Sequence, residues 1–472
     1  MTDVAVYGAT AAGVAAALAA HDAGAQTVLL DPGAHIGGMV SGGLSWTDVG
    51  DVRVLGGFAR RFYGAVAEHY RAPLWGVRGP EPRVAEAILT AWLDGLDVRL
   101  GTGEVPDAAV YVDASYEGDL MAGMGVPFAV GREPRSLYEE TWAGRQPAYR
   151  PGKHNFSVLL SPFASDGELL PHVRQPELDA RGWPAERLAE GDGGLQAYGY
   201  RVCLTDRDPI PFPEPDGYDP GEYELLRRYL AAAPGAEVLG LVSDLLPGGK
   251  CDVNSIGPFS LNVLDGSNRE YLDGDRAAVR AHHLRYTQGL LYFLSGARED
   301  VARWGLCRDE FTDTDGWPHQ LYVRDARRMR GRYVLREADL LDAHPQTDVV
   351  ALGSYNIDIR EVERTWRRLP EYDAVPAVFN EGYLSVAVPP YPIPYRSLVP
   401  RRQDAANLLV PICLSASHVA FASVRMEPTL MLLGEAAGLA AAQAARRCIA
   451  VQDIDVDALQ RSLRDRGQVL SL

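Results

Sequence analysis

The sequence has 472 residues, 47% of them hydrophobic, and its 63 acidic and 46 basic residues give a formal net charge of −17. This length favours two interleaved lobes over a single domain, and the negative charge disfavours nucleic acid and anionic membranes as partners. Five scattered cysteines without a CxxC pair indicate neither a disulfide framework nor a zinc site, as expected in a reducing cytoplasm.

The first predicted unit is a strand, a glycine turn and a helix. The apolar run 4–7 predicts the strand, and the alanine-rich run 14–23 predicts the helix. Between them, Gly8 and Gly13 fill the outer positions of the G-x-G-x-x-G fingerprint, while Thr10 replaces the glycine that lets backbone approach a pyrophosphate. Such a turn also occurs without a nucleotide, so its neighbours decide its meaning. The strand passes straight into the turn without a basic leader, so we expect no signal peptide here.

A second strand and a second glycine segment follow. The strand 27–30 ends in Asp31, about 20 residues after the turn, where a carboxylate can bond an unphosphorylated ribose. Residues 35–44 then bring two glycine pairs, whose backbone N–H groups can lie along a flavin's diphosphate and ribityl chain. The residues of interest there are Gly37, Gly38, Met39, Gly42 and Gly43. An NAD-only domain does not need this segment, and its apolar residues oppose the alternative of a flexible surface loop.

The middle of the chain carries candidate substrate chemistry. Prolines, glycines and polar residues interrupt residues 132–215, which indicates loops over a site, and helical patterns return at 223–233, 276–297 and more weakly 325–332. Arginines are dense around the last stretch, and their planar fork suits a carboxylate or the flavin phosphates. The functional candidates among them are Arg324, Arg327 and Arg328.

Two further groups of polar residues lie in this region. Tyr355 and Asp358 follow the strand-like run 349–352 and would form a wall for a polar substrate, with a purely structural turn as the alternative. His282 and His283 lie in a helical stretch without acidic ligands at matching spacing. We therefore assign no metal.

Near the C-terminus, the run 407–412 predicts a buried strand, followed by a turn that ends at His418. Imidazole there can act as the base of an alcohol or amine oxidation; a core histidine is the alternative. The run 428–445 predicts a helix with proline in its first turn, and its small residues predict close packing against the N-terminal unit. Its positive end would face the flavin pyrimidine. Arg425, just upstream, would stabilise reduced flavin or anchor substrate, with a salt bridge as the alternative.

The helix 428–445 also bears on membrane insertion. Its most apolar part, 430–445, contains Glu435 and Gln443 and is more than half alanine and glycine, which favours a buried helix over a membrane span.

These motifs together resemble the FAD-dependent oxidoreductase family, whose glutathione-reductase-type FAD domain opens with a YGGTPAG-like turn, here residues 7–13. Thr10 is then the usual variant of the family. Similar blocks run in order along essentially the whole chain, at 35–48, 113–120, 198–205, 321–329, 353–358, 394–398 and 415–428.

The resemblance implies an α/β fold. A doubly wound FAD/NAD(P)-binding domain with a parallel sheet of βαβ units would be assembled from residues 1–126 and 395–472, and an α+β substrate domain, 127–394, would be inserted. By motif match, the dinucleotide would contact Gly8, Thr10, Gly13, Asp31, Gly37, Gly38, Gly42 and Gly43. Ala114 and Ser115 would lie on the adenosine side, and Pro428 and Thr429 at the isoalloxazine edge.

The sequence departs from the family pattern at two places. Only residues 101–109 stand where the family usually has a long β-meander, although Val105 could still offer backbone contacts to adenine. Ile359 and Arg360 replace the family's usual serine and histidine after the NID block. If that histidine is catalytic elsewhere, its function is lost or has moved here.

We therefore expect a cytoplasmic FAD-dependent dehydrogenase or oxidase of a small polar substrate, an alcohol or amine, with oxygen or another carrier as electron acceptor. The candidate catalytic residues are His418, Tyr355, Asp358 and Arg324. A flavin-dependent hydroxylase and a non-catalytic FAD-binding module are the alternatives, and the acidic charge opposes a tRNA-modifying flavoprotein.

Overall fold

The computed structural model describes residues 2–146, 154–176, 185–369 and 372–472. The chain folds into two compact units. Unit 1 contains residues 1–130, 325–358 and 385–472, and unit 2 contains residues 131–324 and 359–384. Residues 325–358 and 385–394 thus pack with the chain ends, whereas the domain boundaries expected at 126/127 and 394/395 stay a prediction.

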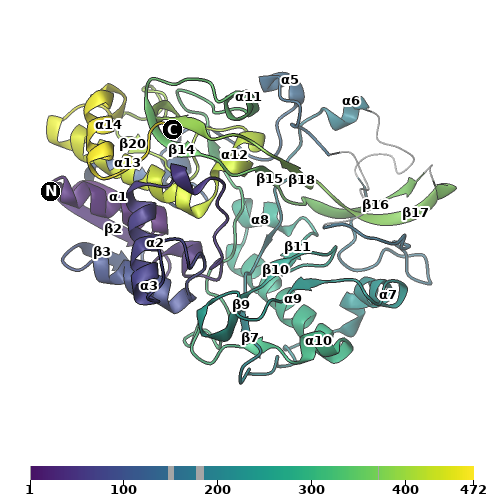
Figure 1. Ribbon diagram of the computed structural model, residues 1–472. Coiled ribbons are helices and arrows are strands. Elements are labelled where there is room, and N and C mark those ends of the chain that lie inside the picture. Colours follow the sequence, from purple (N-terminus) through teal and green to yellow (C-terminus); the bar gives the residue numbers. More distant parts are fainter. Residues whose placement is uncertain (1, 147–153, 177–184, 370–371) are drawn as a thin grey trace. The chain divides into compact units, whose positions relative to one another are not determined.

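Unit 1 is built on a five-stranded parallel sheet in the order β20-β4-β1-β2-β3 (Figure 1). The strands are β1 (Thr2–Tyr7), β2 (Thr27–Asp31), β3 (Asp97–Leu100), β4 (Ala108–Asp113) and β20 (Leu408–Leu409). Val4 of β1 pairs with Thr27 on one side and Val110 on the other. Strands from both ends of the chain therefore share one sheet, which confirms the predicted doubly wound α/β fold.

Two long helices pack their backbones directly against each other in unit 1. They are α1 (Ala11–Asp22) and α13 (Glu427–Arg447), drawn in purple and yellow in Figure 1. A Cβ on Gly434 would lie 2.1 Å from the Ala12 carbonyl oxygen, and one on Gly438 would lie 2.1 Å from that of Ala16. The close packing predicted for the small-residue helix is confirmed.

The remaining elements of unit 1 include two further helices of similar length to α1, namely α2 (Gly57–His69) and α3 (Pro82–Trp92), and several shorter segments. The shorter segments are η1 (Gly38–Val40), η2 (Val52–Val54), α4 (Asp119–Gly123), β5 (Phe128–Ala129), β13 (Arg328–Met329), α11 (Glu337–Leu341), β14 (Val349–Gly353), β19 (Tyr391–Pro394), η6 (Tyr395–Ser397), α12 (His418–Val424), η7 (Val451–Asp453) and α14 (Val456–Asp465). Strand β14 confirms the run 349–352. No helix among the described residues is both long and apolar enough to cross a membrane.

The weak helix predicted at 325–332 is wrong. The chain there forms the two-residue strand β13, which pairs with β5. Met329 donates its N–H to the Cys413 carbonyl, and Arg330 donates its N–H to that of Pro127. These backbone groups bond distant segments, so tertiary pairing overrides the local helical preference.

Unit 2 is a mixture of short strands and helices around its own apolar core. Its elements are α5 (Arg135–Tyr138), α6 (Ala185–Leu188), β6 (Tyr198–Gly199), β7 (Cys203–Thr205), η3 (Pro220–Tyr223), α7 (Glu224–Ala232), β8 (Leu239–Gly240), η4 (Pro247–Gly249), β9 (Lys250–Asp252), β10 (Asn254–Ser255), β11 (Asn262–Val263), α8 (Ser267–Asp273), α9 (Arg276–Ala297), α10 (Glu299–Ala302), β12 (Gly305–Leu306), β16 (Glu363–Leu369) and β17 (Val375–Glu381). Strands β15 (Ile357–Ile359) and β18 (Leu384–Val386) lie where the sequence passes between the units.

The core of unit 2 gathers large side chains such as Phe156, Leu290 and Trp304. Helices α7 and α9 confirm the helical patterns at 223–233 and 276–297. The stretch 132–215 contains only short elements, and its residues 147–153 and 177–184 lie outside the described part of the chain.

Candidate functional site

The first glycine turn joins β1 to α1. Thr10 is the N-cap of α1: its hydroxyl accepts the Gly13 N–H at 3.0 Å and donates to the Ala114 carbonyl at 2.9 Å. Gly8 has a φ of +102°, and a Cβ there would lie 2.6 Å from the carbonyl carbon of Ala114. The threonine that replaces the middle glycine thus ties the helix start to the end of β4.

Asp31, at the end of β2, holds the same turn from the other side. One carboxylate oxygen accepts the Ala9 N–H at 2.6 Å, and the other accepts the Gly33 N–H at 2.6 Å. The carboxylate lies next to the N-terminus of α1, where both a ribose hydroxyl and a phosphate find partners in dinucleotide-binding folds.

The second glycine segment curls through left-handed backbone. Gly37, Gly38 and Gly43 have φ values of +107°, +58° and +116°, which favour glycine. Met39 is fully buried and Val40 nearly so, which excludes the alternative of a solvated surface loop. Gly42 donates its N–H to the Met39 carbonyl at 3.2 Å and closes the turn.

Tyr116 connects this segment to the start of α13. Its hydroxyl accepts the Met39 N–H at 3.0 Å and donates to Glu427 Oε1 at 2.7 Å. A Cβ on Gly38 would lie 2.6 Å from the same hydroxyl oxygen, so only glycine fits there. Sequence reasoning missed both Tyr116 and Glu427; the only signal was an acidic residue in the first turn of the predicted helix.

Glu427 is the first residue of α13, followed in the first turn by the buried residues Pro428 and Thr429. Burial raises the pKa of Glu427 to about 7, and the hydrogen bond from Tyr116 counteracts part of this rise. The helix start that we expected to contact the isoalloxazine therefore contains a buried acid.

The candidate residues of the adenosine side lie just after β4. Ala114 donates its N–H to the Tyr7 carbonyl at 2.7 Å. The Ser115 hydroxyl donates to Asp113 at 2.6 Å, and burial raises the pKa of Asp113 to about 6. Val105, in the short connection between β3 and β4, packs half-buried against the sheet residues around Tyr7.

The sequence predicted that His418 ends a turn, but in the structure His418 begins helix α12. Ser417 is the N-cap of this helix, and its hydroxyl accepts the Ala420 N–H at 3.1 Å. His418 Nδ1 lies 3.0 Å from Asp325 Oδ2, and both side chains are buried. Sequence reasoning missed Asp325 because its partner is distant in the chain.

The other end of α12 holds the segment with Tyr355 and Asp358. The Ser423 hydroxyl donates to the Tyr355 carbonyl at 2.5 Å, and Arg425 donates to the Asp358 carbonyl at 2.7 Å. Arg425 Nη2 also lies 3.4 Å from the Asp358 carboxylate. One short helix therefore brings together His418, Arg425 and the two polar candidates that follow β14.

The arginine candidates have separate structural contacts. Arg327 donates to the Glu117 carbonyl and to the Asp119 carboxylate, both at 3.0 Å. Arg328 is fully buried in β13. In unit 2, the Arg324 guanidinium lies 4.1 Å from the centre of the Tyr322 ring, and it donates to the Ala197 carbonyl.

Unit 2 contains another buried imidazole beside an arginine, that of His154, which sequence reasoning missed. Arg360 Nη1 donates to His154 Nε2 at 3.0 Å, and His154 Nδ1 lies 3.5 Å from Glu361 Oε1. The backbone of His154 is left-handed, with a φ of +65°. The arginine that replaces the family's histidine at 360 thus bonds a histidine from elsewhere in the sequence.

His282 and His283 were considered for metal binding. Among the described residues, they belong to no group of three His, Cys, Asp or Glu side chains whose ligand atoms lie close enough to share an ion. His282 bonds Asp265 at 2.7 Å, and His283 bonds the Ser267 hydroxyl at 2.8 Å. The absence of a metal stays a prediction.

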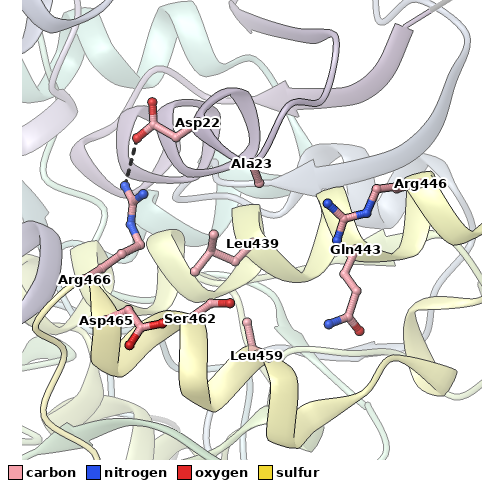
Figure 2. Close-up of a pocket in the computed structure, with 9 residues that line it drawn as sticks. All are labelled: Asp22, Ala23, Leu439, Gln443, Arg446, Leu459, Ser462, Asp465 and Arg466. Carbon is pink, nitrogen blue, oxygen red and sulfur yellow. Dashed lines mark hydrogen bonds and ion pairs between the residues drawn. The ribbon is translucent and has the colours of Figure 1, made fainter.

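A surface cavity of about 360 Å³ lies between the end of α1, α13 and α14. Figure 2 shows its lining residues and the ion pair of 3.0 Å between Arg466 and Asp22. None of the predicted cofactor or catalytic residues lines it. This cavity is therefore separate from the candidate site.

The donor set at the sheet edge fits a flavin dinucleotide. A helix N-terminus, glycines held in left-handed backbone, and a carboxylate after β2 are together the features that such a cofactor site uses. The fold and this site define a dinucleotide-binding protein of the doubly wound class.

A comparison with protein families identifies the family of this dinucleotide-binding protein. The model of the FAD dependent oxidoreductase family matches residues 3–110 and 99–463, so the chain belongs to this family. It is an enzyme, and its cofactor is FAD. The two matched segments overlap at 99–110, which includes the short connection between β3 and β4.

Solved structures give only partial matches. OxyS anhydrotetracycline hydroxylase from Streptomyces rimosus is 20% identical over 28% of this chain and 35% of its own, with a TM-score of 0.22. THI4 from Thermovibrio ammonificans is 16% identical over 28% of this chain and 66% of its own, with a TM-score of 0.21. Thioredoxin reductase of T. acidophilum is 15% identical over 24% of this chain and 34% of its own, with a TM-score of 0.16.

These matches span between a third and two thirds of the other chains. No curated protein matches the sequence. We therefore infer no activity from individual relatives.

Proposed function

We propose that this enzyme is a dehydrogenase or oxidase that moves a hydride between FAD and a small polar substrate, an alcohol or amine. The observation that carries the proposal is the buried pair of His418 and Asp325 at the start of α12. Bound FAD supplies the hydride acceptor or donor at its N5 atom.

His418 would act as the base for the substrate O–H or N–H. A carboxylate can only accept, so the Asp325 carboxylate, 3.0 Å from Nδ1, would favour the imidazole tautomer that carries its hydrogen on Nδ1. The proton would then be taken up at Nε2, and Asp325 would stabilise the resulting imidazolium. Because both groups are buried, their attraction is stronger than it would be in water.

Tyr355, Asp358 and Arg425 would orient the polar substrate. The support is that α12, which begins with His418, also binds the segment of Tyr355 and Asp358 through Ser423 and Arg425. Arg324 remains a candidate catalytic residue because of its positive charge. The five free cysteines favour the cytoplasm as the location, and oxygen or another carrier would reoxidise the enzyme.

The test is anaerobic mixing of the FAD-loaded enzyme with a panel of alcohols and amines while the flavin absorbance is followed. We expect one class to bleach the flavin band. His418→Asn should slow the bleaching by about 10²–10⁴-fold, and Asp325→Asn should slow it as well because an amide can hold the wrong imidazole tautomer.

His344→Asn is the matched control, since His344 is half exposed in the same unit, and this variant should bleach at the wild-type rate. Substrate-dependent oxygen uptake that requires NADPH would instead identify a hydroxylase. A flavin that no substrate bleaches would indicate a binding module and contradict the proposal.

A further inference from the structure

Glu427 joins the two elements on which the proposed flavin site depends. It begins α13, and it accepts a hydrogen bond from Tyr116, which in turn accepts the backbone N–H of Met39. Met39 lies in η1 of the second glycine segment, and Pro428 follows Glu427 directly. The carboxyl is therefore fixed between the parts expected to hold the diphosphate side and the isoalloxazine edge.

Within the described part of the chain, Glu427 has no cation to balance its charge. Among the described residues, no lysine, arginine or histidine lies within ion-pair distance of it, and the ionisable groups that face it are the phenols of Tyr116 and Tyr63. Glu435, two turns later on the same helix and equally buried, is bonded by Arg466 Nε at 2.7 Å. A buried carboxyl without a cation exchanges its proton near neutral pH.

We propose that Glu427 takes up a proton from solvent when FAD is reduced and releases it when FAD is reoxidised. This inference rests on the proposed function and on the placement, expected from the sequence, of the start of α13 against the isoalloxazine. Reduction by hydride places two electrons and one proton on the cofactor, and negative charge gathers at its pyrimidine. A carboxylate nearby in a low-dielectric site then becomes costly, so Glu427 gains one proton, and no further electrons are involved.

The oxidised cofactor leaves Glu427 in its resting equilibrium. Burial holds its pKa at about 7, so a large fraction is ionised at slightly alkaline pH. The Tyr116 hydroxyl donates to the ionised form and stabilises it. Proton uptake on reduction is thus expected above pH 7, where an ionised carboxylate is present to accept the proton.

The experiment is a redox titration of the FAD-loaded enzyme at an electrode between pH 6 and pH 9. Each proton that accompanies two electrons changes the potential by about 30 mV per pH unit. In the wild type, we expect the slope of the reduction potential against pH to become steeper by about 30 mV per pH unit above pH 7. In Glu427→Gln, the slope should not steepen above pH 7. Tyr116→Phe should move the onset of the steep region to higher pH.

Glu435→Gln is the matched control and should retain the wild-type profile. An infrared carboxyl band should also appear on reduction in the wild type and be missing in Glu427→Gln. A steep slope that persists in Glu427→Gln, or a wild type that gains no carboxyl band, overturns the inference. These measurements need no substrate. A failure of the inference can therefore be distinguished from a failure of the proposed function, in which no substrate bleaches the flavin.

Discussion

Glu427 also makes the stability of the cofactor-free protein depend on pH. Its pKa is about 7 in the folded protein against 4.5 in the unfolded chain, so the folded state binds the extra proton between these values. The unfolding free energy therefore carries no penalty from Glu427 below about pH 4.5, and it falls as the pH rises to about 7. Above that pH, burial of the ionised carboxylate lowers the unfolding free energy by about 3 kcal/mol.

We predict that Glu427→Gln removes this cost. The variant should match the wild type near pH 4.5 and exceed its unfolding free energy by about 3 kcal/mol at pH 8. Urea unfolding at several pH values measures the difference. An equal gap between the two proteins at pH 5 and pH 8 would contradict the assignment.

Glu435→Gln should behave in the opposite way. This carboxylate accepts the Phe58 N–H at 2.8 Å and pairs with Arg466. Its neutralisation weakens the ion pair between this buried carboxyl and the partly exposed Arg466 guanidinium, so the variant should be less stable than the wild type at neutral pH.

Single residues also mark the limit of prediction from the sequence. The glycines and Thr10 could be recognised because they lie in two short continuous segments of the sequence. Asp325 and Tyr116 could not be predicted, because Asp325 acts through its contact with His418 and Tyr116 through its contact with Glu427. Tyr116 and Glu427 are separated by 311 positions in the sequence. No local pattern carries such a contact.

At the scale of elements, the contact of α1 with α13 depends on two glycines. We predict that Gly434→Ala destabilises the protein by about 1–3 kcal/mol, because the new methyl group would meet the Ala12 carbonyl oxygen at 2.1 Å. The midpoint of urea unfolding reports the change.

Gly64→Ala is the matched control within another helix of the same unit. Nothing lies within 4 Å of a Cβ at Gly64 in α2, so the same substitution should stabilise the protein by about 0.5–1 kcal/mol. If both variants shift the midpoint in the same direction, backbone contact between α1 and α13 is not what Gly434 provides.

Elements with strong periodicity were predictable, and elements formed by distant pairing were not. Helix α9 coincides with the helical pattern at 276–297, whose length and apolar spacing suffice locally. Residues 325–332 carry a similar but weaker pattern and form β13, because their N–H groups bond Cys413 and Pro127. Helix α12 was missed since its seven residues are too few for a periodic signal.

At the scale of the whole molecule, the net charge of −17 makes a prediction about nucleic acid. Because this net charge repels phosphate backbones, the protein should not retard tRNA in a native gel even at about 50 mM salt, where electrostatic binding is strong. A shift that disappears as salt is added would revive the tRNA-modifying alternative. A tRNA-binding protein of known affinity serves as the positive control.

The discontinuous sheet of unit 1 has a consequence for biosynthesis. Strand β20 and helix α13 come from the last part of the chain, yet they join β4 and α1 from the first. A ribosome therefore translates all residues from β1 through α13 before the nucleotide cradle can close. We expect FAD to be loaded only after α13 has been made, so that newly made chains pass through a cofactor-free state whose lifetime depends on the cellular supply of FAD.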